Sequence, residues 1–225
     1  MKFKIFGERN TGTRALKALI ELNLGADVLP STEQELAPER CPGIEKDEAA
    51  MDALFAGMPA ALSWKHCATL FDDLESLDGV TVLITVKHPL AWLVSFFDRP
   101  YHWRKAETVA EFAARPWTTV QRERLGGRAF TPLELYRAKL ESYFDLADKM
   151  ETAFVRSEDI VLDPEKTLRK LGLEGPFRPL QHSTKDKTKS VADYAAYYGE
   201  ERWRSRLDGV SEQPDWQQVA RFGYR

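Results

Sequence analysis

A short loop with two glycines, Gly7 and Gly12, stands between an apolar run and a stretch of helical periodicity in the segment IFGERNTGTRAL. In a strand–loop–helix unit, the loop N–H groups and the helix N-terminus face one point, and glycines let the backbone wrap an anion there. Gly7-x4-Gly12 has the glycine spacing of a Walker A loop. The spacing predicts a phosphate cradle, and a plain strand–turn–helix is the alternative.

The residues after the second glycine do not suit transfer of a γ-phosphate. A Walker A loop places Lys and then Ser or Thr there, to reach the β- and γ-phosphates and to hold Mg²⁺. Thr13 and Arg14 occupy these positions here, and the sequence has no clear acidic strand end for Mg²⁺. A nucleotide or small-molecule kinase is therefore the weaker alternative, which magnesium-dependent turnover of ATP would support.

A second candidate for anion binding is the segment TVKHPLAWLVSFF, in which Lys87 ends a β-branched run. Pro89 suits the first turn of a helix, so Ser95 is expected about two turns further on. A cation and a hydroxyl can give charge-assisted hydrogen bonds to a dianionic phosphate. The alternative is a strand end followed by a buried helix.

His66, in SWKHCAT, is the candidate general base. It is expected at the C-terminal end of a strand, where open α/β sheets bind ligands, and its pKa suits proton transfer near neutrality. Its neighbour Lys65 can supply a cation. A structural histidine is the alternative. His88 is assigned a local structural role, and His182 has no evident partner.

Two further segments are candidates for contact with ligands. Aromatic rings with polar partners suit stacking on a sugar or another flat acceptor, although core packing is the commoner role for such rings. The residues of this kind are Tyr101, His102 and Trp103. The basic segment STKDKTKS contains Lys187 and Lys189, which can close over a phosphate or can simply be solvated.

Strands and helices are expected to alternate along the chain. The patterns predict strands over residues 2–6, 60–65, 80–86 and 152–155, and helices over 14–23, 90–97 and 133–149. Asp163 and Pro164 predict the start of another helix. This order favours an α/β fold with a mostly parallel sheet in one domain, 1–225, with irregular excursions at 31–47 and 115–130.

The composition narrows the possible partners. The net charge of −3, with 43% hydrophobic and 30% charged residues, is that of an ordinary globular protein without a global footprint for nucleic acid. Cys41 and Cys67 lack metal or redox spacing. No apolar stretch approaches the roughly 20 residues that span a bilayer. With a polar N-terminus, these features lead us to expect a cytoplasmic protein.

Taken together, the motifs resemble those of the P-loop sulfotransferases, in particular bacterial carbohydrate-type members, which use 3′-phosphoadenosine 5′-phosphosulfate (PAPS). RNTGTRAL resembles the family's 5′-phosphosulfate loop, often written PKSGTTWL, and KHPLAWLVSFF resembles its 3′-phosphate motif, RxPxxxxxS. FVRSEDIVLDPEKTLRKLGL and the C-terminal YYGEERWRSRL are similar to later family segments. The resemblance touches residues 3–20, 60–100, 130–173 and 180–225.

The resemblance implies a P-loop NTPase-like three-layer sandwich that moves a sulfuryl group from PAPS to an acceptor hydroxyl and releases 3′,5′-ADP, without a metal. The acceptor would be a carbohydrate or glycoconjugate. The family's base is often a His or Glu near His66, and the Glu158–Asp159 pair would be structural. The implied ligands of the 5′-phosphosulfate are Arg9, Asn10, Thr11, Gly12, Thr13 and Arg14, and those of the 3′-phosphate are Lys87, Ser95, Lys187 and Lys189.

Two departures from the family pattern matter for the chemistry. The family's loop lysine, which assists the bridging oxygen of the leaving group, aligns with Asn10, and Arg9, Arg14 or Lys65 are the candidates to supply that charge. The family's arginine in the 3′-phosphate motif is Lys87, which keeps the charge but loses the bidentate fork. The missing loop lysine also leaves open a non-catalytic relative that binds an anion or nucleotide.

Overall fold

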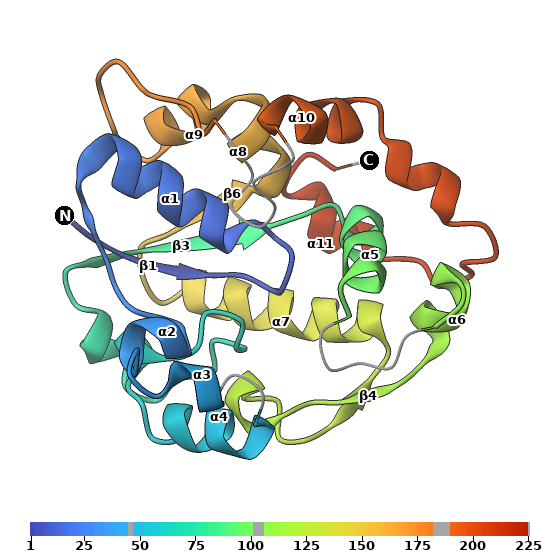
Figure 1. Cartoon of the computed structure of the whole chain (residues 1–225), viewed down its shortest axis with the longest axis horizontal. Coiled ribbons are helices and arrows are strands. Elements are labelled where there is room, and N and C mark those ends of the chain that lie inside the picture. The colour runs from blue at the N-terminus through green and yellow to red at the C-terminus, as the bar shows by residue number, and fades with distance from the viewer. Residues whose placement is uncertain (45–46, 101–105, 182–189, 225) are drawn as a thin grey trace.

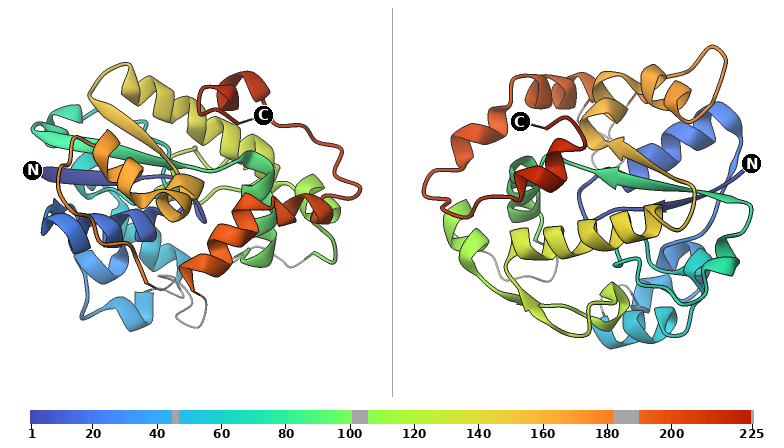
Figure 2. Two further views of the ribbon diagram at one scale, coloured as in Figure 1. Left: turned by 90° about the horizontal axis from the view of Figure 1, so that it is seen from above. Right: turned by 180° about the vertical axis from the view of Figure 1, so that it is seen from behind.

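The computed structural model describes residues 1–44, 47–100, 106–181 and 190–224. A four-stranded sheet lies between two layers of helices, as Figure 1 shows from the front and Figure 2 from above. The strand order is β2-β1-β3-β6 and every pair is parallel. The α/β class and the mostly parallel sheet expected from the sequence are therefore confirmed.

Three of the predicted strands form with nearly the predicted bounds. They are β1 (Lys2–Phe6), β3 (Val80–Val86) and β6 (Thr152–Arg156), and the sequence did not predict the short β2 (Asp27–Val28) at one edge. Ile5 pairs with Leu83 and Ile84 with Phe154 in the ladder. The parallel register places the C-terminal ends of β1, β3 and β6 at one edge of the sheet, where α/β proteins bind ligands.

One face of the sheet is covered by α1 (Thr13–Leu24), α8 (Ser157–Leu162) and α9 (Pro164–Lys170). Leu16 and Ile20 of α1 pack with Phe3 and Leu83 of the strands in one buried apolar cluster. The helix predicted over 14–23 is α1, and its apolar face follows the spacing of its leucines and isoleucine. The side chain of Asp163 caps α9 as predicted, accepting from Lys166 N at 3.0 Å.

The other face is covered by α5 (Pro89–Asp98) and α7 (Pro132–Ala147). Trp92 of α5 and Tyr143 of α7 pack with Val82 and Ile84 in the larger core cluster. Both helices have proline in the first turn, where its missing N–H costs no hydrogen bond. The helices predicted over 90–97 and 133–149 correspond to these two.

The strand predicted over 60–65 is wrong. Residues Ala60–Leu62 form a short 3₁₀ helix, η1, because the carboxylate of Asp73 accepts from Ala60 N at 2.9 Å and starts a turn there. The chain then extends across the end of the sheet: Lys65 N donates to Ser31 O at 3.2 Å, and Gly7 N donates to Lys65 O at 3.0 Å. The segment still reaches the ligand-binding edge, but as a crossing loop.

The excursions expected to be irregular contain short elements. The first holds α2 (Glu33–Leu36) and α3 (Cys41–Ile44), and the second holds β4 (Trp117–Thr118), η3 (Gln121–Glu123) and β5 (Ala129–Phe130). The first excursion and α4 (Glu48–Phe55) supply a third apolar cluster, which also contains Trp64. The remaining elements are η2 (Leu74–Leu77), α6 (Val109–Ala114), α10 (Val191–Gly199), η4 (Arg202–Arg206) and α11 (Trp216–Ala220). Within the described residues, no helix has the length and apolar character needed to cross a membrane.

Candidate functional site

The turn between β1 and α1 requires glycine at its start. Gly7 has a φ of 152°, and a Cβ there would lie 2.6 Å from Thr85 O and 2.7 Å from Thr11 Oγ1. Gly12, with a φ of 93°, is the N-cap of α1. The loop therefore bends closely against the end of β3, which a side chain at Gly7 would prevent.

The hydroxyl of Thr11 stabilises the conformation of this loop through hydrogen bonds. It is fully buried, donates to Glu8 O at 2.6 Å and lies 2.7 Å from Thr85 Oγ1. The family resemblance implied that Thr11 is a ligand of the 5′-phosphosulfate. In the structure its bonds hold the loop in shape, so only the Thr11 backbone remains as a candidate ligand.

The N-terminus of α1 can receive an anion. Its first turn contains no acidic residue, and within the described residues no side chain caps it. Thr13, the first residue of the helix, is buried, and Arg14 beside it is exposed. Unpaired N–H groups, the helix dipole and a nearby guanidinium all favour negative charge at this point.

Lys65 comes to the same place from the crossing loop. Only 7% of it is exposed, and its backbone is bonded to Gly7 on one side and Ser31 on the other. Burial, together with the nearby charge of Arg14, lowers the pKa of the Lys65 amine to about 8. Asn10 occupies the loop position with a left-handed φ of 66°. A lysine from a distant segment thus stands beside a loop that lacks its own.

One hydrogen bond determines the proton arrangement of His66. Its Nδ1 lies 2.6 Å from Gly7 O, and a carbonyl can only accept, so Nδ1 carries the proton. Burial, and then the charges of Lys65 and Arg9, hold the pKa of the His66 imidazole well below its ordinary 6.5. The ring is therefore neutral, with an unprotonated Nε2 to which no described group donates. This is the state that a general base requires.

A buried cluster of four charges lies under the loop and His66. Arg9 pairs with Glu123 at 2.5 Å and with Glu8 at 3.4 Å. Lys139 of α7 pairs with Glu8 and, at 3.2 Å, with Glu123, and it donates to the His66 carbonyl at 2.7 Å. Although burial opposes ionisation, the charges of Lys139 and Arg9 hold the pKa of Glu123 far below its usual range.

This cluster changes the role expected for Arg9. Its guanidinium is 2% exposed, is balanced by two carboxylates and lies 4.7 Å from the centre of the Trp64 ring. Arg122 packs against the same ring at 4.8 Å, and Trp64 meets His66 edge to face at 5.1 Å. Arg9 therefore supports the loop and His66, and its positive charge is balanced by the carboxylates of Glu8 and Glu123.

Lys87 and Ser95 lie together, as the spacing of their motif predicts. Lys87 Nζ donates to Ser95 Oγ at 2.7 Å, and the Ser95 hydroxyl donates in turn to Ala91 O at 2.9 Å. Both residues follow the C-terminal end of β3, next to the β1 loop. Lys87 also donates to Tyr198 OH at 2.6 Å, a contact that the sequence analysis missed because Tyr198 comes from the distant helix α10.

The neighbouring residues are structural, as expected. His88 Nδ1 accepts from Leu90 N at 3.2 Å and caps α5. Glu158 accepts from His88 N at 3.0 Å and from Tyr224 OH at 2.7 Å, so it ties the end of β3 to the C-terminal segment. Five expected ligands lie outside the described residues: Tyr101, His102, Trp103, Lys187 and Lys189.

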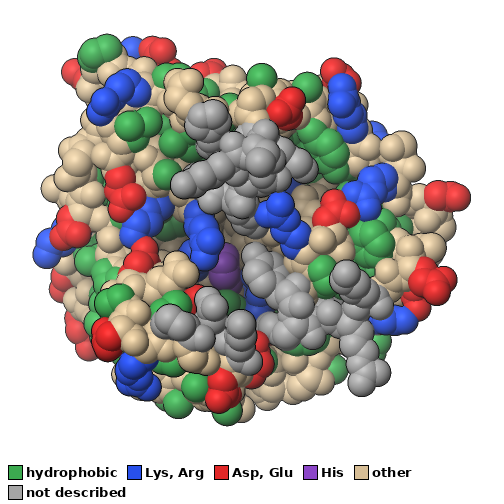
Figure 3. All heavy atoms as spheres, in the orientation of Figure 1, with side chains coloured by type: hydrophobic (Ala, Val, Ile, Leu, Met, Phe, Trp, Pro, Cys, Tyr) green, Lys and Arg blue, Asp and Glu red, His purple; other side chains and the backbone are tan. Residues whose placement is uncertain are grey.

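The surface of this region is basic. On the face shown in Figure 3, lysine and arginine side chains gather around a hollow, and a histidine side chain is visible within it. At this edge of the sheet, Arg14 lies in the first turn of α1, Lys87 follows β3, and Lys65 lies on the crossing loop bonded to Gly7. The arrangement suits a ligand with several negative charges.

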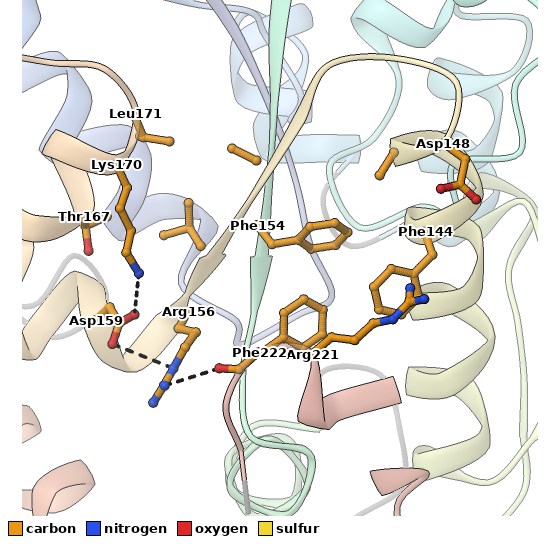
Figure 4. Close-up of a pocket in the computed structure, with 13 residues that line it drawn as sticks. Phe144, Asp148, Phe154, Arg156, Asp159, Thr167, Lys170, Leu171, Arg221 and Phe222 are labelled. Atoms are coloured by element: carbon orange, nitrogen blue, oxygen red, sulfur yellow. Dashed lines mark hydrogen bonds and ion pairs between the residues drawn. The ribbon is translucent and has the colours of Figure 1, made fainter. Parts of the chain in front are cut away.

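A cavity of about 470 Å³ lies elsewhere, beside the edge strand β6 (Figure 4). Its wall contains stacked rings, Phe144 on Phe222 at 5.6 Å, and its Arg156 and Lys170 are both near Asp159, at 3.7 and 4.0 Å. None of the expected site residues lines it. Because Arg156 and Lys170 are both near Asp159 and its rings pack the C-terminal segment, we assign it no part in the chemistry.

Comparison with known proteins identifies the fold. No family model and no curated protein matches the sequence. Among solved structures, the chain is similar to the sulfotransferase domain of the olefin synthase from Synechococcus PCC 7002, with 17% identity and a TM-score of 0.51, over 100% of this chain and 95% of that chain. At this identity the likeness concerns the fold alone.

Proposed function

We propose that the protein is a sulfotransferase that moves a sulfuryl group from PAPS to an acceptor hydroxyl and releases 3′,5′-ADP. One observation carries the proposal: two anion-binding features follow adjacent parallel strands. The Gly7 turn with α1 follows β1, and Lys87 with Ser95 follows β3, so both stand at the same edge of the sheet. A nucleotide with phosphate groups on both sides of its ribose fits this pair.

Lys87 provides the test of fit. Its side chain is 2% exposed, and its ammonium contacts only hydroxyls and an aromatic face among the described residues. A buried charge is costly unless a counter-charge accompanies it. A phosphate on Lys87 would supply that counter-charge, and a 3′-phosphate is what distinguishes PAPS from ATP.

His66 and Lys65 would carry the transfer. The Nε2 atom of His66 takes the proton of the acceptor hydroxyl while the new S–O bond forms and the S–O bond to the bridging phosphate oxygen breaks. Lys65 and Arg14 stabilise the negative charge that develops on that bridging oxygen. We assign Lys65 the charge that the family carries on its loop lysine, because Lys65 is bonded to Gly7 and the charge of Arg9 is already balanced.

The choice of cofactor can be tested by calorimetric titration. We expect binding of 3′,5′-ADP without metal, and weaker binding of ATP with or without Mg²⁺. Tighter binding of ATP would favour a kinase, and no binding of either nucleotide would reject the proposal. The variant Lys87→Ala should lose most affinity for 3′,5′-ADP, whereas Lys149→Ala, at an exposed position on another part of the chain, should not.

The acceptor can then be sought with PAPS and a set of hydroxyl compounds. Carbohydrates and glycoconjugates are the first class to screen, as the sequence resemblance suggests. Transfer to any member, followed by mass spectrometry of the product, supports the enzyme. Tight binding of 3′,5′-ADP without transfer to any tested acceptor would instead favour a non-catalytic nucleotide-binding protein.

A further inference from the structure

Tyr198 completes the environment of Lys87 from a helix that the site motifs do not include. Its hydroxyl accepts from Lys87 Nζ at 2.6 Å, and the Nζ atom lies 4.7 Å from the centre of its ring. The phenol therefore contacts the ammonium through its oxygen and through its π face. Ser95 occupies the other side of the same ammonium, at 2.7 Å.

The donors of this cluster exceed its acceptors. An ammonium has three donors and no acceptor, so both hydroxyl oxygens must accept from Lys87. The Ser95 proton is used by Ala91 O at 2.9 Å. Among the described residues no group accepts the Tyr198 proton or the third proton of Lys87. Two donors, one of them charged, thus remain beside each other, and this combination calls for an anionic acceptor.

Tyr198 is held in this position by contacts on the C-terminal side of α10. Trp203 of η4 is buried and packs against His88, next to Lys87, with ring centres 4.5 Å apart and ring planes tilted by 36°. Arg206 at the end of η4 binds Asp98 at the end of α5 through two hydrogen bonds of 2.8 and 2.7 Å. These contacts fix the segment after Tyr198 on the same helix that carries Ser95.

We propose that Tyr198 is a ligand of the ribose 3′-phosphate and a determinant of selectivity for 3′-phosphorylated nucleotides. This inference rests on the proposed function. When the nucleotide binds, the Tyr198 O–H donates to a phosphate oxygen while its own oxygen continues to accept from Lys87. Ser95, with its proton on Ala91, orients the ammonium. The selectivity then depends on a hydroxyl that lies far from the motif in sequence.

The experiment compares two nucleotides that differ only in the 3′-phosphate, 3′,5′-ADP and 5′-AMP. Their dissociation constants are measured by calorimetry for the wild-type protein, Tyr198→Phe and Tyr197→Phe. A hydrogen bond to a charged group is worth about 1.5–3 kcal/mol, so Tyr198→Phe should bind 3′,5′-ADP about tenfold or more weakly. Binding of 5′-AMP should be unchanged.

Tyr197→Phe is the matched control, because its ring meets Tyr198 at 80° and its hydroxyl interacts with Arg206. It should bind both nucleotides as the wild type does. Phenylalanine keeps the ring of Tyr198 on Lys87, and unchanged thermal melting would show that each variant is folded.

The outcomes separate the two proposals. If the wild-type protein does not prefer 3′,5′-ADP over 5′-AMP, the proposed function fails. If the wild type prefers it and Lys87→Ala removes the preference, but Tyr198→Phe retains it in full, the inference about Tyr198 is wrong. Tighter binding of 3′,5′-ADP by Tyr198→Phe would also overturn it, because the hydroxyl would then compete with the phosphate.

Discussion

At the scale of single residues, a hydrogen bond to a main-chain carbonyl gives His66 the tautomer that its proposed role as general base requires. The carbonyl of Gly7 holds the proton on Nδ1 and leaves the lone pair on Nε2. Burial and neighbouring cations lower the pKa of the ring, so the ring stays neutral at pH values below its ordinary pKa of 6.5. The same glycine shapes the loop between β1 and α1, so one residue orients both the proposed base and the loop proposed to bind an anion.

Replacing His66 with glutamine should slow sulfuryl transfer by about 10²–10⁴-fold, the usual contribution of a general base. Binding of 3′,5′-ADP should change little, because the ring faces the acceptor proton in the proposed reaction. Turnover assays and calorimetry measure the two effects. Asp72→Asn, an exposed change in the same region, serves as the control. A wild-type rate for His66→Gln would reject the assignment.

The pH dependence of transfer gives an independent check on His66. Since its pKa lies well below 6.5, the base stays unprotonated as the pH falls through 6.5. We expect kcat/KM to hold across that point and to decline only in more acid solution, as Nε2 gains its proton. A midpoint at or above 6.5 in the acid limb would contradict the lowered pKa of the His66 ring.

The buried charges beneath His66 allow a prediction about stability. Glu123→Gln leaves Arg9 and Lys139 with Glu8 as their shared carboxylate. Loss of one partner from a buried ion pair typically costs about 3–5 kcal/mol. Glu165→Gln breaks an exposed pair with Arg169 at 2.7 Å and should cost under about 1 kcal/mol. Urea denaturation of both variants measures the difference, and equal losses would contradict the proposed support.

At the scale of elements, the decisive unit is β1 with its loop and α1. The strand supplies buried apolar pairing, Gly7 allows the turn to approach β3, and the uncapped start of α1 supplies N–H groups. The crossing loop adds Lys65 and His66 by bonding to Gly7 N. Gly7 thus has two roles: its backbone conformation allows the turn, and its N–H bonds the distant crossing loop.

Gly7→Ala should therefore destabilise the protein by about 3 kcal/mol or more, because its Cβ would overlap the Thr85 carbonyl at 2.6 Å. Gly25→Ala is the matched control: its φ of 55° is also left-handed, but nothing lies within 4 Å of the added Cβ. It should lose only about 1–2 kcal/mol. Thermal and urea unfolding measure both. Similar losses would show that backbone conformation, and not close approach, makes Gly7 necessary.

At the scale of the whole molecule, the fold buries two lysines whose amines have lower pKa values than an amine in water. Lys4, in the middle of β1, is fully buried and donates to Pro30 O at 2.9 Å and Ser63 O at 2.8 Å. Burial lowers the pKa of the Lys4 amine to about 7. With Lys65 at about 8, two amines release protons in the folded chain before they would in the unfolded one.

This difference in pKa couples folding to pH. Between the folded pKa of about 7 and the ordinary value of 10.5, the unfolded chain binds more protons at Lys4, so stability rises with pH. Lys4 alone should raise the free energy of unfolding by up to about 1.4 kcal/mol per pH unit. Urea denaturation of the wild-type protein at pH values from 7 to 9 should show this rise in the free energy of unfolding, and Lys4→Met should show a smaller rise. The control Lys149→Met should show the same rise as the wild type. A rise in Lys4→Met equal to that of the wild type would refute the coupling.

Much of the fold could be predicted from the sequence because it depends on local patterns. Three such patterns determine structure only a few residues away in the sequence. They are the β-branched run that forms β3, the alternation in β1, and the prolines that begin α5 and α7. The spacing of Lys87 and Ser95 also survives folding, since one helix connects them. The segment 60–65 was misread because Asp73, outside it, decides its turn.

The sequence by itself determined that a loop with two glycines, a cation at a strand end and a histidine occur along a chain of α/β order. Only the tertiary structure decided which charges remain for a ligand. Arg9 is balanced by Glu8 and Glu123, and Thr11 is bonded within its loop, whereas Lys87 is enclosed by hydroxyls. Burial makes each unpaired charge costly, so the contacts of distant segments, invisible in a local motif, determine where an anion is needed.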